Sequence, residues 1–152
     1  MNSPLSRRSL LAGAVAGLML PLAARAQTLA PNAQEPTDMR VRFAFSTFTM
    51  TAMLYDNPSA RDFFAMLPLD LTISDFGRNE KIAYLPRKLT EEGAGTFENE
   101  QPYDLCYCRP WGNLAMFYAG YEHTGLIRLG RFEEGQEALH ERGEFPLQIE
   151  AI

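Results

Sequence analysis

An aromatic turn is the first candidate for binding chemistry in this sequence. Residues 110–113 read Pro-Trp-Gly-Asn, and Trp111 is the only tryptophan in the chain. An indole in a turn offers a ligand a flat apolar face and one N–H donor. Asn113 is suited either to stabilising the turn or to bonding a ligand. Tyr107 lies just before the turn, and packing in the core is the alternative for these aromatic side chains.

Three arginines are candidate anion ligands. Arg61 lies off the apolar face of a predicted helix, and Arg87 follows a proline that ends a predicted strand. Arg128 stands between two apolar residues of another predicted strand, so its side chain faces the opposite side from theirs. A guanidinium binds a carboxylate through two parallel hydrogen bonds. Each arginine is therefore either an anion ligand at the rim of the fold or a partner in a structural ion pair.

The two thiols, Cys106 and Cys108, are separated by one residue on a predicted strand. At this spacing the Cα atoms lie about 6.5–7 Å apart, the upper end of what a disulfide tolerates. We expect two small side chains on one strand face, with a strained redox pair as the alternative. His123 and His140 stand in no metal-ligand pattern, and no metal or other cofactor is expected. No nucleophile–base motif or phosphate-binding loop is present either.

The first 26 residues have the order of a Tat-type signal peptide. Arg7 and Arg8 precede an uncharged apolar run, and residues 24–26, Ala-Arg-Ala, form a small-x-small cleavage site. The run is shorter than the ~20 apolar residues that span a bilayer, so no stable membrane insertion is expected. A Sec signal that contains two arginines is the alternative. We predict export to the periplasm through the Tat machinery.

The remainder of the chain is acidic. Residues 1–26 contain three arginines and no acidic residue, so the remainder has a formal charge of −8 against −5 for the whole chain. Nucleic-acid binding depends on clustered Lys and Arg and is not expected. Residues 27–38 are polar, contain prolines and lack periodicity, which predicts a flexible leader. One folded domain is expected over residues 39–152.

Short strands dominate the folded part. Alternating apolar residues over 41–45 and 48–54 predict a β-hairpin. A helix is expected after Asn57, a good N-cap, with Pro58 in its first position and Pro68 ending it. Short strands with regular turns are typical of a sandwich or barrel. Further strands are expected at 69–73, 82–85, 103–108, 114–118, 125–131 and 145–149, with helical turns within 133–142 and a solvated loop over 90–102.

Four segments stand out together in the order of the chain. They are LYDNPSARDF (54–63), EKIAYLPRKL (80–89), PWGNLAMFY (110–118) and GLIRLGR (125–131). As an ordered set they resemble the cyclophilin-like family of small bacterial and archaeal proteins. The resemblance covers nearly all of residues 39–152. It implies a mainly β fold, a closed cyclophilin-like barrel of about eight strands with one or two short helices.

The resemblance does not extend to the isomerase motifs of true cyclophilins. Those enzymes use an arginine of a Phe-His-Arg segment to lower a barrier of ~20 kcal/mol, and they carry a Gln-Gly-Gly-Asp segment. Neither segment occurs here. We therefore expect a barrel that binds a small anionic molecule or a peptide. The alternatives are a prolyl isomerase with a rearranged site and, from the resemblance, an accessory protein that docks on a flavodoxin-type redox partner. The expected ligand-binding residues are Arg61, Arg87, Tyr107, Trp111, Asn113 and Arg128.

Overall fold

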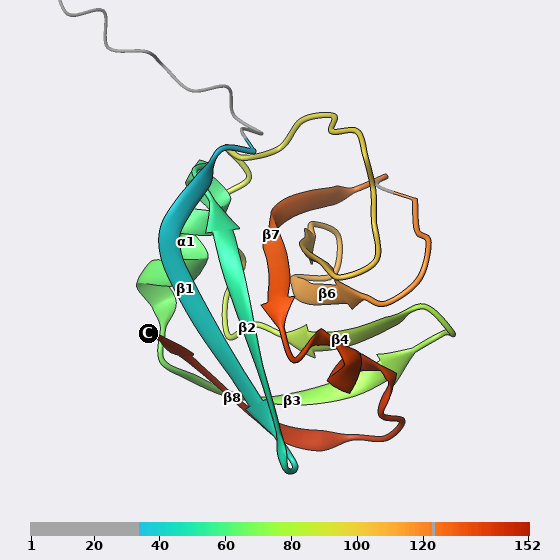
Figure 1. Cartoon of the computed structure of the whole chain (residues 1–152). Coiled ribbons are helices and arrows are strands. Elements are labelled where there is room, and N and C mark those ends of the chain that lie inside the picture. Colours follow the sequence, from blue (N-terminus) through green and yellow to red (C-terminus); the bar gives the residue numbers. More distant parts are fainter. Residues whose placement is uncertain (1–33, 123) are drawn as a thin grey trace, which may run out of the picture.

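The computed structural model describes residues 34–122 and 124–152. These residues form a closed antiparallel barrel in the order β1-β2-β7-β5-β6-β4-β3-β8 (Figure 1). The mainly β fold and the closure expected from the family resemblance are therefore confirmed. The strands are β1 (Pro36–Phe45), β2 (Phe48–Tyr55), β3 (Leu69–Phe76), β4 (Glu80–Tyr84), β5 (Asp104–Cys108), β6 (Asn113–Phe117), β7 (Leu126–Glu134) and β8 (Phe145–Ala151).

The β1–β2 hairpin follows from its period-two pattern. Phe45 pairs with Phe48 across a two-residue turn, as expected. However, β1 begins at Pro36, three residues before the expected domain boundary at Met39. Thr37 explains the earlier start, because its hydroxyl donates a 2.7 Å hydrogen bond to the Leu54 carbonyl. The expected signal peptide and the leader up to residue 33 lie outside the described residues.

The helix α1 (Pro58–Met66) begins and ends close to the expected residues. The side-chain oxygen of Asn57 accepts a 2.9 Å hydrogen bond from the Ala60 amide, which caps the first turn. The Asn57 amide nitrogen also donates to the Arg128 carbonyl at 3.1 Å, which ties the helix to β7. A 3₁₀ helix, η1 (Gln136–His140), accounts for the expected helical turns before β8.

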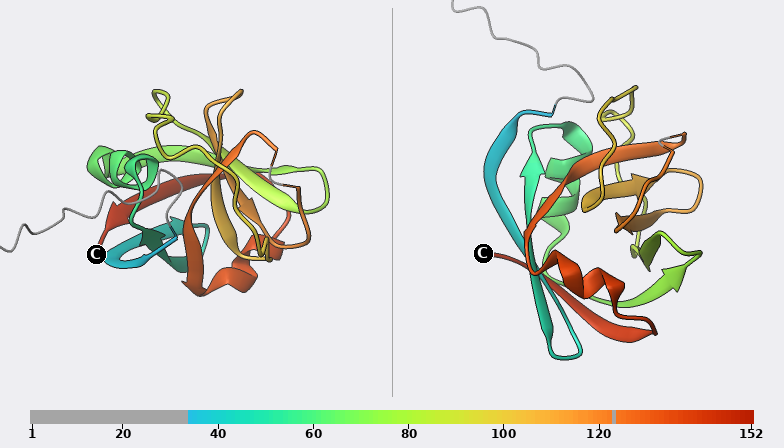
Figure 2. Two further views of the ribbon diagram at one scale, coloured as in Figure 1. Left: turned by 90° about the horizontal axis from the view of Figure 1, so that it is seen from above. Right: turned by 45° about the vertical axis from the view of Figure 1, so that its right-hand side comes forward.

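Apolar side chains form two separate clusters, one inside the barrel and one on its outer surface. Alternation along β5 places Leu105 and Tyr107 inside, whereas Cys106 packs outside with Phe117. The segment between β4 and β5, yellow in Figures 1 and 2, passes over one end of the barrel. Residues 90–102 form a loop that is exposed over most of its length, as expected, but its Phe97 is buried in the outer cluster, so the loop is not solvated throughout.

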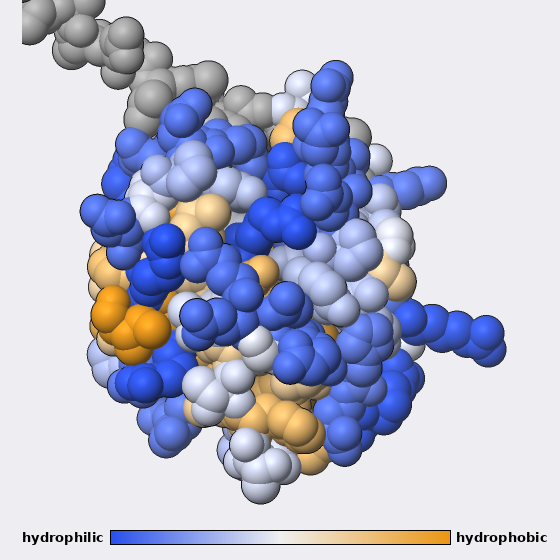
Figure 3. Space-filling model, in the orientation of Figure 1, coloured by the Kyte–Doolittle hydropathy of each residue, from blue (hydrophilic) through white to orange (hydrophobic). Residues whose placement is uncertain are grey.

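The described surface is mainly hydrophilic in the view of Figure 3, where hydrophobic residues lie in small groups. Within residues 34–122 and 124–152, no helix has the length and apolar character needed to cross a membrane.

Candidate functional site

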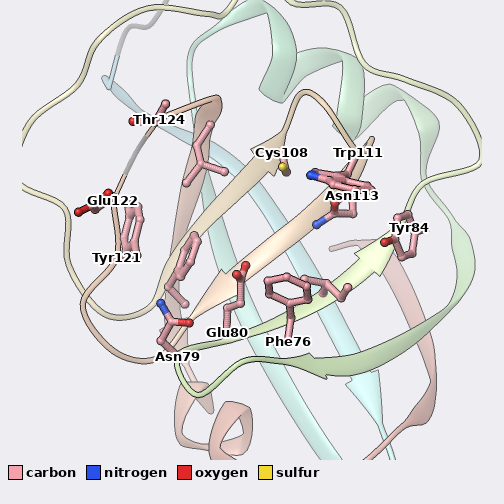
Figure 4. Close-up of a pocket in the computed structure, with 13 residues that line it drawn as sticks. Phe76, Asn79, Glu80, Tyr84, Cys108, Trp111, Asn113, Tyr121, Glu122 and Thr124 are labelled. Atoms are coloured by element: carbon pink, nitrogen blue, oxygen red, sulfur yellow. The ribbon is translucent and has the colours of Figure 1, made fainter.

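A pocket of about 430 Å³ lies on the outer surface of the barrel (Figure 4). Strand alternation builds its floor. Glu80, Ile82 and Tyr84 of β4 line the pocket, whereas Lys81 and Ala83 between them are fully buried on the other side of the strand. Adjacent strands β6, β5 and β7 supply further lining residues, so the pocket is held by the rigid wall of the barrel.

Aromatic rings form both ends of the pocket. At one end Tyr121 stacks on Phe117, with ring centroids 3.9 Å apart and an angle of 9° between the planes. At the other end Trp111, Phe76 and Tyr84 are 72%, 60% and 55% exposed. Among the described residues these are three of the four large apolar side chains that are strongly exposed. An apolar concentration of this kind is typical of a binding surface.

Glu80 is the charged group on the pocket floor. Its side chain is half-buried, and no hydrogen bond or ion pair to it is found in the described part of the chain. Burial raises the pKa of this carboxyl from 4.5 to about 7, because desolvation disfavours the charged form. Glu80 therefore exchanges its proton close to neutral pH. Glu80 was not among the expected ligand-binding residues, although its alternation with Ile82 and Tyr84 indicates that the three side chains share one face of a strand.

The two cysteines are free thiols on the outer face. Cys106 is fully buried, with its sulfur 3.7 Å from the Tyr121 hydroxyl, and Cys108 lines the pocket. Burial raises the pKa of both thiols. A raised pKa leaves little thiolate at neutral pH, so neither group has the character of an activated nucleophile.

Beside the pocket lies a buried ion pair between β7 and β5. Nη1 of Arg128 is 3.1 Å from Oδ2 of Asp104, and its guanidinium lies 4.6 Å from the ring centroid of Phe97. Nε of Arg128 donates a further hydrogen bond of 2.7 Å to Gln34. Desolvation acts to lower the pKa of Arg128, but the Asp104 carboxylate outweighs it and the pKa is raised.

The other expected ligand residues are distributed over the molecule. Trp111 and Asn113 line the pocket together. Arg61 instead forms an ion pair with Asp56, and Tyr107 is buried in the barrel core, where its hydroxyl accepts a 3.2 Å hydrogen bond from the Leu89 amide. Arg87 binds both carboxylate oxygens of Asp62, at 2.8 and 3.1 Å. Arg61, Arg87, Tyr107 and Arg128 thus lie outside the lining of the pocket.

Within the described ranges, no group of three or more His, Cys, Asp or Glu side chains is arranged to hold a metal ion.

Comparison with known proteins assigns this barrel to a family. The model of the Cyclophilin-like family matches residues 43–150. The chain belongs to the cyclophilin-like family. A similar solved structure is the solution structure of the hypothetical protein AF2241 from Archaeoglobus fulgidus. That structure matches with a TM-score of 0.60 and 15% identity, over 78% of this chain and 98% of the archaeal one. A comparison with curated proteins finds no match.

The likeness to the archaeal structure shows the fold alone, and the chemistry of this cyclophilin-like protein depends on the residues of its own pocket. Strands that form the floor, stacked and exposed rings, and the half-buried carboxyl of Glu80 are features of a site that binds a ligand.

Proposed function

We propose that this cyclophilin-like protein binds peptides in the outer pocket. The observation that supports this best is the position of Trp111, Phe76 and Tyr84, which are strongly exposed and line the same pocket. Exposed rings at one concave site present apolar area that a ligand removes from water. The rigid β4 and β6 floor limits the ordering that a peptide would have to impose on the protein.

The charges of the pocket favour a peptide over a small anion. Its lining contains the carboxyl groups of Glu80 and Glu122, and no Lys or Arg is found among its described residues. The expected anion ligands Arg61 and Arg87 are each engaged by an aspartate. No particular contact in the described residues favours a prolyl isomerase or docking to a flavodoxin-type partner.

We further propose that binding takes place in the periplasm, after Tat export directed by the signal sequence at residues 1–26. An acidic protein outside the cytoplasm would meet unfolded or extended segments of other exported proteins. These are peptide ligands with both apolar and charged side chains.

Titration with a panel of blocked pentapeptides tests the binding function. Trp111 is the only tryptophan, so its fluorescence reports directly on the pocket. Peptides that bind are expected to shift its emission. Tyr84→Ala should weaken binding at least about fivefold, because it removes one exposed ring from the lining. Ile152→Ala is a matched control, since Ile152 is also 55% exposed but lies outside the pocket lining.

Two results would contradict the proposal. One is that no peptide in the panel changes the Trp111 emission or gives heat in calorimetry. The other is that Tyr84→Ala and Ile152→Ala bind the same peptides with equal affinity.

A further inference from the structure

Glu80 lacks the kind of cationic partner that Asp62, Asp75 and Asp104 have. Asp62 binds Arg87, Asp75 binds Lys81 at 2.8 Å, and Asp104 binds Arg128. The side chain of Glu80 is half-buried as well, yet no ion pair or hydrogen bond reaches it from the described residues. A desolvated carboxylate without a partner is unfavourable in the free protein. Such a group therefore points to a donor that arrives with the ligand.

The carboxyl group of Glu80 points into the middle of the pocket. Figure 4 shows it between Tyr121 on one side and Phe76 on the other, with Trp111 and Asn113 farther along the cavity. A ligand that reaches Glu80 from the rim therefore passes along aromatic surfaces. Aromatic faces attract cations through the ring quadrupole, in addition to removing apolar surface from water.

Among residues 34–122 and 124–152, the titratable groups that line the pocket with Glu80 carry no positive charge. Cys108 comes from β5, Tyr121 and Glu122 come from the segment between β6 and β7, and Tyr84 lies on the same strand. Burial raises the pKa values of Cys108 and Tyr121, so both stay protonated near neutral pH. The described lining therefore contributes two carboxyl groups and no cation to the electrostatic potential in the pocket, which favours a positively charged ligand.

We propose that the pocket binds a lysine side chain of a peptide, with the lysine ammonium group paired to the Glu80 carboxylate. The inference rests on the proposed function and names its substrate class. The four-carbon stem of lysine packs on apolar surface while its compact charge reaches the carboxylate. The exposed rings of Trp111 and Tyr84 at the rim are available to the flanking residues of the peptide, a contact that a free small amine lacks.

The decisive experiment compares two peptides that differ only in charge. Acetyl-Ala-Ala-Lys-Ala-Ala-amide and the same peptide with norleucine in place of lysine are titrated at pH 8 by calorimetry and Trp111 fluorescence. We expect the lysine peptide to bind about tenfold more tightly, the size of one charge-assisted hydrogen bond. Its affinity should also rise between pH 6 and pH 8, as Glu80 loses its proton while lysine stays charged.

Two variants separate a role in binding from a loss of folding. Glu80→Gln is expected to remove the preference for lysine, so that the lysine and norleucine peptides bind with equal affinity. Glu150→Gln is the matched control, because it removes the same charge from β8, where Glu150 pairs with Arg42 outside the pocket. A cooperative urea-unfolding transition like that of the unaltered protein shows that Glu80→Gln is folded.

The outcomes distinguish this inference from the function on which it rests. Equal binding of the two peptides, with both weakened by Tyr84→Ala, overturns the lysine assignment and leaves peptide binding in place. A lysine preference that survives Glu80→Gln overturns the assignment of Glu80. Binding of n-butylamine as tight as that of the lysine peptide overturns a peptide ligand in favour of a small amine. No response to any peptide overturns both proposals.

Discussion

The hydroxyl of Tyr121 donates a 2.6 Å hydrogen bond to Oδ2 of Asp104. The same carboxylate oxygen accepts Nη1 of Arg128 at 3.1 Å, so one wall of the pocket is joined to the buried ion pair between β5 and β7. The ring of Tyr121 stacks on Phe117 at the same time. Burial, together with the neighbouring Cys106 and Asp104, raises the pKa of Tyr121, which keeps its hydroxyl a donor. The pocket and the ion pair should therefore respond to each other's mutations.

Tyr121→Phe tests this connection. The ring can keep its stacking on Phe117, but Asp104 loses a donor in a buried site. We expect a loss of about 1–2 kcal/mol in the free energy of unfolding, measured by urea denaturation. Tyr84→Phe removes a hydroxyl from an exposed ring and should change the stability by less than about 0.5 kcal/mol. Equal effects of the two variants would contradict the role of this hydrogen bond.

Arg128→Met should be among the most destabilising arginine substitutions. Of the cations that the described residues place beside the fully buried Asp104, it leaves Arg131, at 3.2 Å. Removing one partner of a buried ion pair typically costs about 3–5 kcal/mol. Arg87→Met, which breaks an exposed pair with Asp62, is the control and should cost about 0–1 kcal/mol in the same denaturation experiment. Similar losses for both variants would show that the buried Arg128–Asp104 pair contributes no more to stability than the exposed Arg87–Asp62 pair.

Glu80 should make the free protein less stable as the pH rises. Its pKa is raised from 4.5 to about 7 in the folded state, so the folded state holds a proton that the unfolded state releases between these values. Stability therefore falls as the pH rises through this window and is fully reduced above pH 7. The shift sets an upper limit of about 3 kcal/mol, which solvent screening of the half-exposed group reduces to about 1–2 kcal/mol.

Glu80→Gln resembles the protonated form at every pH. Relative to the unaltered protein, the variant should therefore show no gain at pH 4.5 and a gain of about 1–2 kcal/mol at pH 8 in urea denaturation. Glu150→Gln serves as the charge-matched control and should follow the unaltered protein. A constant difference between Glu80→Gln and the unaltered protein from pH 4.5 to pH 8 would rule out the titration of Glu80 as the cause.

The two thiols should react at different rates. Cys106 is fully buried, whereas Cys108 is partly exposed in the pocket, and burial raises the pKa of both. Iodoacetamide at pH 7.5 is expected to modify Cys108 slowly and Cys106 only after unfolding, as followed by intact-mass spectrometry. In Cys108→Ser the folded protein should remain unmodified. Rapid modification of both thiols in the folded protein would contradict this arrangement.

The proposed export route depends on Arg7 and Arg8. Replacing both by lysine preserves the positive charge but removes the twin-arginine pair. Export by the Tat route predicts that the variant accumulates in the cytoplasm with its signal peptide uncleaved, as seen by cell fractionation and immunoblotting. Unchanged delivery to the periplasm would instead identify a Sec signal.

The elements that were predicted correctly are those that depend on near neighbours in the chain. Asn57 caps α1 through an amide three residues away, and Pro58 suits the first position of the helix. The β1–β2 hairpin is encoded by side chains that alternate over consecutive residues. The early start of β1 was not predicted, because the Thr37 hydroxyl bonds to the carbonyl of Leu54, 17 residues away, and no local pattern indicates such a contact.

What the sequence by itself determined is the set of strands, the helix and the family resemblance from which a closed barrel was expected. Only the tertiary structure decided what each charged side chain faces. Arg128 meets Asp104 because β7 pairs with β5. Trp111 shares a pocket with Glu80 because β4 pairs with β6, the strand that follows the Trp111 turn. Ion pairing and desolvation depend on distances of a few ångströms between residues far apart in the chain, and these distances exist only once the barrel has closed.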